Sequence, residues 1–424
     1  MSKQEKTARH VKPPAAFLPY GRQQLDADDV RAVTDVLASD WLTCGPKVEE
    51  FEQALAKACG ARHAVAVSNG TAALHVALLA AGIGPGDRVL TTPNTFVASA
   101  NGAAYVGATP DFADIDPLTL NLSPVALERR WRKDVRAVVA VDFAGYPCDL
   151  PAIAELARAR GAVVIEDAAH ALGTRFRVGG RWHKVGGHPW ADLTTLSFHP
   201  VKTITTGEGG AILTHDDKLA ARCRQFRSHG IVREAAAFEL DPDTLAPRSS
   251  GVPTTMAPWY YEMQALGFNY RITDIQCALG VSQLAKLPAF MRRRQEIVNR
   301  YNRAFAPLPY VRCPVQAQQA AGSIERARPS WHLYVLRIDF AALGWTRADF
   351  MQALRARGLG SQVHYIPVHL QPFYRATYGY ASGLCPVAEK YYQQCLSLPL
   401  YASMSDAAVA RVVAAVQQLL KANQ

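Results

Sequence analysis

The chain has 424 residues, of which 49% are hydrophobic and 19% charged, a balance that is typical of folded globular proteins and excludes a disordered chain. This length exceeds what a single hydrophobic core usually serves, so we expect two domains. The net charge of +10 is spread along the chain without a block of lysines and arginines. That distribution argues against a nucleic-acid partner and leaves open whether the charge attracts an anionic ligand.

The eight cysteines stand singly and form no CxxC pair, so the sequence predicts neither a zinc ribbon nor a redox motif, and we expect no metal site. Residues 1–16 are polar and basic and lack the apolar segment of a secretory signal, so we expect a loose tail there. Apolar runs all fall short of the about 18 residues that a membrane span needs. We therefore expect a cytoplasmic protein with no membrane partner.

In chain order, apolar periodicity first predicts helices over residues 24–37 and 48–59. A strand at 64–67 then runs through Ser68, Asn69, Gly70 and Thr71 into a helix over 72–81. Such a turn leaves free N–H groups at the start of the helix, where the helix dipole favours a phosphate. An ordinary strand-to-helix turn with a hydroxyl cap is the alternative that the pattern leaves open.

Further strands are predicted at residues 88–90, 110–115, 135–141, 162–167, 192–198 and 211–214, alternating with helices. This alternation predicts a mostly parallel sheet covered on both faces. Phe96 follows the strand at 88–90 and could stack on a flat ring, or could simply be core. Asp167 closes a buried strand, where it could pair with a protonated pyridine nitrogen or cap a helix, and His170 could reach the same ring.

The stretch 196–210 holds one lysine, Lys202, framed by hydroxyl residues and followed by three glycines. A lysine in such a site can form a Schiff base with pyridoxal phosphate (PLP), because its amine condenses with aldehydes and its pKa falls when it is desolvated. A solvated loop lysine is the alternative. A phosphate loop does not match, since the glycines follow the lysine instead of preceding it.

Residues 234–258 contain several prolines and glycines and predict a long loop. A helix is expected over 273–286, and a separate linker helix over 288–305. Beyond it we expect strands at 332–339 and 361–365 and helices at 346–357, 388–396 and 406–421. We therefore expect a large domain over residues 17–287 and a smaller α+β domain over 288–424.

Taken in order, these motifs, together with the Gly-Phe-Asn-Tyr-Arg segment at 267–271, resemble the DegT/DnrJ/StrS family of nucleotide-sugar aminotransferases. The resemblance runs from about Tyr20 to the C-terminal helix. It implies the fold type I architecture of aspartate aminotransferase and PLP as cofactor. Segments 259–263, 269–280 and 362–369 look most like the branch of pseudaminic acid biosynthesis, whose members make UDP-4-amino-4,6-dideoxy-N-acetyl-β-L-altrosamine with glutamate as amino donor.

The resemblance also implies the catalytic roles. Lys202 would form the Schiff base and then carry a proton between the substrate carbon and the cofactor. Asp167 would pair with the pyridine nitrogen, Phe96 would cover one ring face, and His170 would approach the ring hydroxyl. Relatives that carry out 3-dehydration have histidine in place of this lysine, so Lys202 favours aminotransfer.

Binding roles follow from the same resemblance. The phosphate would be held by Thr71, Ala72 and Ser197. Asn269 would reach the phosphate site of a neighbouring subunit, which implies a homodimer with a shared active site. The nucleotide-sugar substrate would be met by Arg271, His364 and Tyr365. Two alternatives stay open: an enzyme acting on another UDP- or dTDP-linked 4-keto-6-deoxy sugar, and a non-catalytic basic protein on the same fold.

Overall fold

The structure, a computed structural model, describes residues 17–240, 259–315 and 321–421. The predicted tail at 1–16 lies outside the described residues, as does most of the predicted loop at 234–258. In the described part of that loop, Ala235–Ala237 forms a single 3-10 turn.

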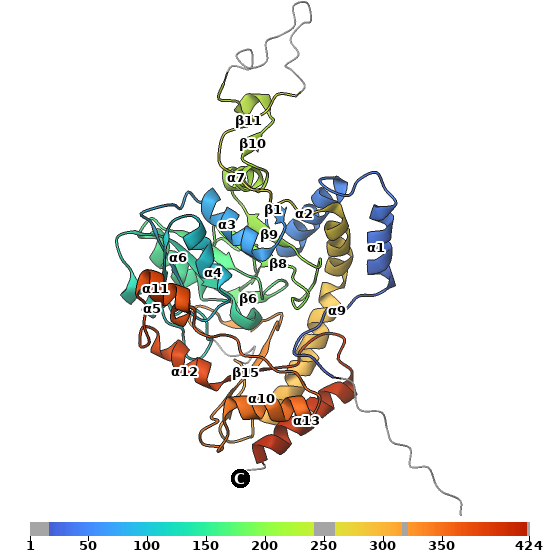
Figure 1. The fold of residues 1–424 in the computed structure, drawn as a ribbon, viewed down its shortest axis with the longest axis vertical. Helices are drawn as coiled ribbons and strands as arrows, with labels where there is room; N and C mark the ends of the chain where they lie inside the picture. Colours follow the sequence, from blue (N-terminus) through green and yellow to red (C-terminus); the bar gives the residue numbers. More distant parts are fainter. Residues whose placement is uncertain (1–16, 241–258, 316–320, 422–424) are drawn as a thin grey trace, which may run out of the picture.

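A seven-stranded mixed sheet lies at the centre of the molecule, with strand order β1-β9-β8-β5-β4-β2-β3 (Figure 1). Its strands are His63–Val67 (β1), Arg88–Thr91 (β2), Thr109–Phe112 (β3), Val135–Val141 (β4), Val163–Asp167 (β5), Leu193–Ser197 (β8) and Gly210–Thr214 (β9). Strands β3, β2, β4, β5 and β8 pair in parallel, whereas β9 runs antiparallel to both of its neighbours. The predicted mostly parallel sheet is therefore confirmed.

Helices cover both faces of this sheet, because its strands are apolar on both sides. Neighbouring residues of β4 point to opposite faces: Val139 packs with α3, α4 and α7, while Val138 packs with α5 and α6. Helix α2 extends the second face, and α1 packs against α9. The bounds are Ala27–Leu37 (α1), Pro46–Cys59 (α2), Gly70–Ala80 (α3), Ala98–Tyr105 (α4), Pro124–Arg130 (α5), Leu150–Arg158 (α6) and Asp217–Arg227 (α7).

The two helices predicted at 273–286 and 288–305 are in fact one, α9 (Asp274–Phe305), so the predicted break was wrong. Proline inside a helix costs about 3 kcal/mol through its missing N–H and its ring. Burial on both sides of Pro288 offsets this cost, since Leu287 packs into the core beneath the sheet and Ile297 into the core of the C-terminal part. Because α9 serves both cores, the division at residues 287 and 288 stays a prediction.

The C-terminal part is built on a three-stranded antiparallel sheet, ordered β12-β14-β15. Its elements are Val311–Arg312 (β12), Tyr334–Ile338 (β14), Arg347–Ala356 (α10), Val368–Leu370 (η3), Pro372–Tyr378 (α11), Pro386–Gln394 (α12), Cys395–Leu398 (β15) and Asp406–Lys421 (α13). The helix predicted at 388–396 ends earlier than expected because Cys395–Leu398 pairs with β14.

The strand predicted at 361–365 was also wrong. Only Gln362 makes a β-bridge, to Ser397. Beyond that bridge, His364 and Tyr365 form hydrogen bonds to Ser397 and His170, and the chain leaves the sheet.

Two small sheets were not predicted. One joins Arg175–Val178 (β6), Arg181–Lys184 (β7) and Arg326–Arg328 (β13). The other pairs Ile231–Val232 (β10) with Glu262–Met263 (β11) in an arm that projects at the top of Figure 1. The Glu262 carboxylate holds the arm by accepting hydrogen bonds from two backbone N–H groups and from the Tyr260 hydroxyl. Large apolar side chains remain exposed there, among them Trp259 at 73%.

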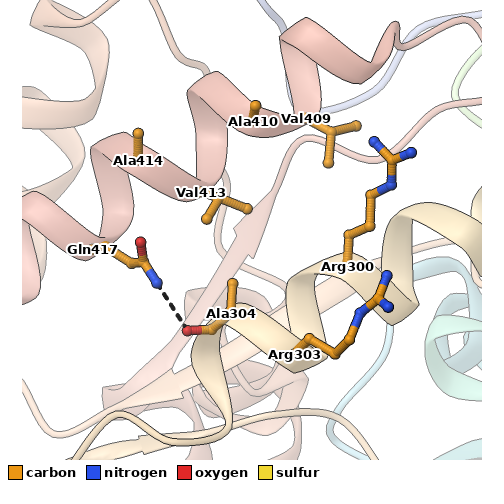
Figure 2. Close-up of a pocket in the computed structure, with 8 residues that line it drawn as sticks. All are labelled: Arg300, Arg303, Ala304, Val409, Ala410, Val413, Ala414 and Gln417. Atoms are coloured by element: carbon orange, nitrogen blue, oxygen red, sulfur yellow. Dashed lines mark hydrogen bonds between the residues drawn. The ribbon is translucent and has the colours of Figure 1, made fainter.

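A hollow of about 400 Å³ lies between α9 and α13 (Figure 2). Arg300 and Arg303 stand on one side of it, and Gln417 closes it by donating to the backbone oxygen of Ala304 at 3.1 Å. The described residues that line this hollow include no acid, histidine or cysteine, so they offer no group for acid–base or nucleophilic chemistry. Among the helices of the described ranges, none combines the length and apolar character needed to cross a membrane.

Candidate active site

A cavity of about 840 Å³ opens where β4, β5 and β8 end, beside the first turn of α3. In parallel α/β sheets, ligands bind at this edge. The predicted site residues that line the cavity are Thr71, Ala72, Phe96, Asp167, His170, Ser197, Lys202, His364 and Tyr365. The cavity thus brings together residues from both halves of the chain.

At one end of the cavity, two glycines allow β8 and β9 to approach the start of α3. A Cβ on Gly70 would lie 2.9 Å from the Cβ of Ser197, and a Cβ on Gly210 would lie 2.5 Å from the backbone oxygen of Asn69. The Asn69 side chain caps α3 by accepting from the N–H of Ala72 at 2.8 Å. Ser197 is therefore held against a helix N-terminus, where hydroxyl and amide donors fit a phosphate dianion.

Asp167, at the end of β5, is only 5% exposed and has two hydrogen-bond donors. The Ser99 hydroxyl donates to Oδ2 at 2.6 Å, and the N–H of Ala169 donates to Oδ1 at 3.2 Å. Burial raises the pKa of the carboxyl, while these donors and the nearby Lys202 oppose the rise. A buried carboxylate at the edge of a cavity is stabilised by a cationic ring nitrogen, so the site fits a pyridinium group.

His170 lies beside Asp167 and is equally buried. Burial lowers the pKa of its ring well below the ordinary value, so the ring is neutral near pH 7. Its Nδ1 accepts from the N–H of Ala144 at 3.3 Å, which leaves the proton on Nε2. The Nε2 nitrogen lies 3.3 Å from the hydroxyl oxygen of Tyr365. His170 therefore presents a neutral donor to the cavity.

Lys202 is half-buried in the loop after β8. Burial lowers the pKa of its amine to about 8, and the negative charge of Asp167 partly opposes this effect. A larger fraction of the amine is therefore unprotonated at neutral pH than in a solvated lysine, and the unprotonated amine is the form that attacks an aldehyde. The solvated-loop alternative does not fit this environment.

We expect the rate at which cofactor-free protein captures PLP to rise about tenfold per pH unit below pH 8 and to level off above it. The reason is that raising the pH through the pKa of Lys202 converts ammonium to reactive amine. Stopped-flow absorbance with excess PLP measures the rate. Nα-acetyl-lysine, whose side-chain amine is free, serves as the reference, since its rate should go on rising toward the ordinary lysine pKa of 10.5. A protein profile parallel to that of the reference would contradict the assignment.

Beneath the cavity, the other face of β5 carries a buried polar cluster around Glu166. Its carboxylate accepts from the Thr194 hydroxyl at 2.7 Å and from the N–H of Gly186 at 3.2 Å, and lies 3.1 Å from Nε2 of His188. The Thr194 bond joins β5 to β8, and the other two join β5 to the segment that leads into β8. They fix the two strands that carry Asp167 and Ser197.

Two predicted residues do not face the cavity of their own chain. Asn269 is exposed on the surface, where its backbone bridges to Ser228. Arg271 lines a separate hollow of about 430 Å³ together with Arg224 and Arg227. Their proposed roles, which for Asn269 involve a second subunit, stay predictions. Phe96 lines the cavity but is 58% exposed, so its stacking role also stays a prediction.

Several residues at the cavity were missed by the sequence analysis, namely Tyr20, Ser99, Tyr105, Tyr270 and His332. For Ser99 a signal was present, because Thr95 and Ser99 stand four residues apart at the start of α4, and their hydroxyls lie 2.7 Å apart. Tyr105 ends the same helix and was also missed. Tyr20, Tyr270 and His332 reach the cavity from distant parts of the chain, and local spacing does not reveal them.

Comparison with known proteins decides the family. The family model described as the DegT/DnrJ/EryC1/StrS aminotransferase family matches residues 23–417. The chain belongs to this family. Both the sequence resemblance and the PLP cofactor are thereby confirmed, and the site geometry above fits that cofactor.

Individual relatives span almost the whole chain. The spore coat polysaccharide biosynthesis protein SpsC of Bacillus subtilis is 41% identical over 406 residues, which cover 96% of this chain and 97% of SpsC. Among solved structures, PseC of Helicobacter pylori, an aminotransferase of pseudaminic acid biosynthesis, has 30% identity and a TM-score of 0.83, covering 96% of this chain and 100% of PseC. Spr1654 of Streptococcus pneumoniae, in its PLP form, has 26% identity and a TM-score of 0.83, with coverage of 96% and 100%. These structures confirm the fold type I architecture.

Proposed function

We propose that this aminotransferase moves an amino group from glutamate to C4 of UDP-2-acetamido-2,6-dideoxy-β-L-arabino-hex-4-ulose, a step of pseudaminic acid biosynthesis. The size of the cavity is the main support for this proposal. Its volume of about 840 Å³ is larger than PLP alone occupies and leaves room for a sugar nucleotide. The similarity to Helicobacter pylori PseC supports the sugar and the pathway.

The residues supply the chemistry in distinct roles. PLP contributes an electron-withdrawing ring, which stabilises negative charge on the carbon that loses a proton. Lys202 is the group whose amine can take up that proton and return it at the neighbouring position. Asp167 would keep positive charge on the ring nitrogen, and the neutral His170 would donate a hydrogen bond to the ring hydroxyl. His364, whose pKa burial lowers to about 3, and Tyr365 offer neutral hydrogen-bonding groups to the sugar.

The proposal includes a cytoplasmic homodimer that shares its active sites. Its support is the exposed position of Asn269 and the exposed apolar side chains of the β10–β11 arm, among them Trp259 and Met263. Apolar side chains gathered on a projecting element are typical of interfaces between subunits. Sedimentation analysis tests the dimer, and Asn269→Ala should weaken PLP retention if that residue reaches a neighbouring site.

A second candidate substrate has support of its own. SpsC, named for spore coat polysaccharide biosynthesis, is 41% identical to this chain, against 30% for PseC. The amino-group acceptor in this alternative is another UDP- or dTDP-linked 4-keto-6-deoxy sugar. The reaction and the roles of Lys202 and Asp167 stay the same.

Turnover on paired 4-keto epimers separates the two candidates. With glutamate as donor, we expect kcat/KM on the UDP-linked L-arabino 4-keto sugar to exceed that on the D-xylo epimer by about tenfold or more, since the two differ at C5 and a misplaced methyl group costs about 1–3 kcal/mol. A dTDP-linked 4-keto sugar serves as the nucleotide control. Preference for the D-xylo or the dTDP compound would replace the proposed substrate with the alternative.

A further inference from the structure

His332 is a second buried imidazole at the cavity, and it comes from the C-terminal part of the chain just before β14. It is 4% exposed and lines the same cavity as Lys202. Its ring centroid lies 4.3 Å from that of His170, with 43° between the ring planes. This is direct packing of one ring against the other.

The backbone that carries His332 is fixed to both parts of the molecule. The guanidinium Nη1 of Arg294, on α9, donates to the backbone oxygens of Trp331 and His332 at 3.1 and 3.3 Å. On the other side, the Ser330 hydroxyl donates to the backbone oxygen of His170 at 2.8 Å. Gly145 makes this approach possible, because a Cβ there would lie 2.7 Å from the Ser330 hydroxyl oxygen.

The polar atoms of the His332 ring contribute little to this arrangement. Among the described residues, its Nδ1 is buried without a hydrogen-bond partner. Burial and the neighbouring Lys202, Arg294, His170 and His364 lower the pKa of the ring well below its ordinary value, so the ring is neutral. What the ring offers His170 is a flat surface.

We propose that His332 is a positioning residue: its ring packs against the His170 imidazole and keeps the Nε2–H of His170 directed into the cofactor cavity. Within the described ranges, the His170 ring has two long hydrogen bonds, both of 3.3 Å, which do not by themselves lock the ring orientation. Phe143 and Tyr365 also face this ring, at 6.2 and 6.3 Å between centroids, and the much closer His332, at 4.3 Å, supplies the missing constraint. The inference rests on the aminotransferase site described above and does not depend on which sugar is accepted.

His332→Phe and His332→Leu form a matched pair, since both remove the ring nitrogens and only phenylalanine keeps a flat ring. Each holoenzyme is mixed with glutamate alone, and two quantities are followed: the absorbance maximum of the bound cofactor and the rate at which the visible band disappears. We expect H332F to keep the wild-type maximum and a rate within about threefold of wild type. We expect H332L to shift the maximum and to slow the rate about 10- to 30-fold, as loss of orientation does.

The controls separate positioning from stability. His183→Leu changes a histidine that packs on Trp190 outside the cavity and should leave both readouts unchanged. Ser330→Ala removes only the hydroxyl that joins this segment to His170, and it is expected to slow the rate about threefold even if H332L does not fold. Wild-type maxima and rates in both H332L and S330A would overturn the inference, as would an H332F variant as slow as H332L.

The wild-type response tests the proposed function separately. If glutamate leaves the wild-type band unchanged, the proposed donor is wrong, and the cofactor maxima of the variants still decide the role of His332.

Discussion

Replacement of Lys202 by alanine is expected to lower the aminotransferase turnover number by about 10⁴-fold or more, the largest effect of any single substitution in this chain. In the proposed function the amine has two tasks, since it both captures the cofactor and moves the proton during transfer. No other lysine or arginine among the described residues lines the cavity, so no neighbour can take over these tasks. Turnover of the 4-keto sugar with glutamate, measured by product mass, reports the loss.

The substitution should leave the fold intact, because a half-buried amine with a lowered pKa contributes little to stability. Thermal unfolding of K202A should therefore stay within a few degrees of wild type. Lys218→Ala, an exposed change on α7, is the matched control and should retain full turnover. Turnover of K202A within tenfold of wild type would show that Lys202 is not the reactive amine.

The fold could be predicted from the sequence where local residues alone determine whether a segment forms a helix or a strand. The stretch at 135–141 forms β4 with the expected bounds, because its apolar residues, interrupted only by the exposed Arg136, suit a strand buried on both faces. Pro288 misled the prediction of α9, since local propensity opposes a helix there while two distant cores stabilise it. For the same reason Cys395–Leu398 continues a helical pattern and yet pairs as a strand with β14.

The cavity residues also divide into those placed by local sequence and those placed by tertiary packing. Asp167 and Lys202 could be predicted because each follows a strand, and strand ends in a parallel sheet meet at one edge. Ser99, which donates to Asp167, and His332, which packs on His170, are placed by tertiary packing. Arg271 shows the reverse case, since its sequence motif resembles that of the family although it lies outside the cavity of its own chain. Its role toward a substrate stays a prediction.

Replacement of Asp167 by asparagine is expected to reduce kcat about 10²- to 10³-fold, because the variant keeps the size of the side chain and removes its charge. The Ala169 N–H would keep an oxygen acceptor, and the Ser99 hydroxyl could accept from the new amide N–H and donate to Thr95 instead, so the local geometry should persist. In the proposed role, what would be lost is the anion that keeps the ring nitrogen of the cofactor protonated. Without that proton the ring withdraws electron density less strongly, so removal of the substrate proton becomes slower.

The measurement that isolates this effect is the rate of the half-reaction with glutamate, followed by the cofactor absorbance. Asp192→Asn is the matched control, since Asp192 also serves a neighbouring strand, by accepting from the N–H of Val164, yet lies outside the cavity. We expect D192N to react at close to the wild-type rate and D167N to be slow while still binding PLP. If D167N kept the wild-type rate, the ring nitrogen would need no anionic partner, and Asp167 would serve only to hold the end of β5 through Ser99.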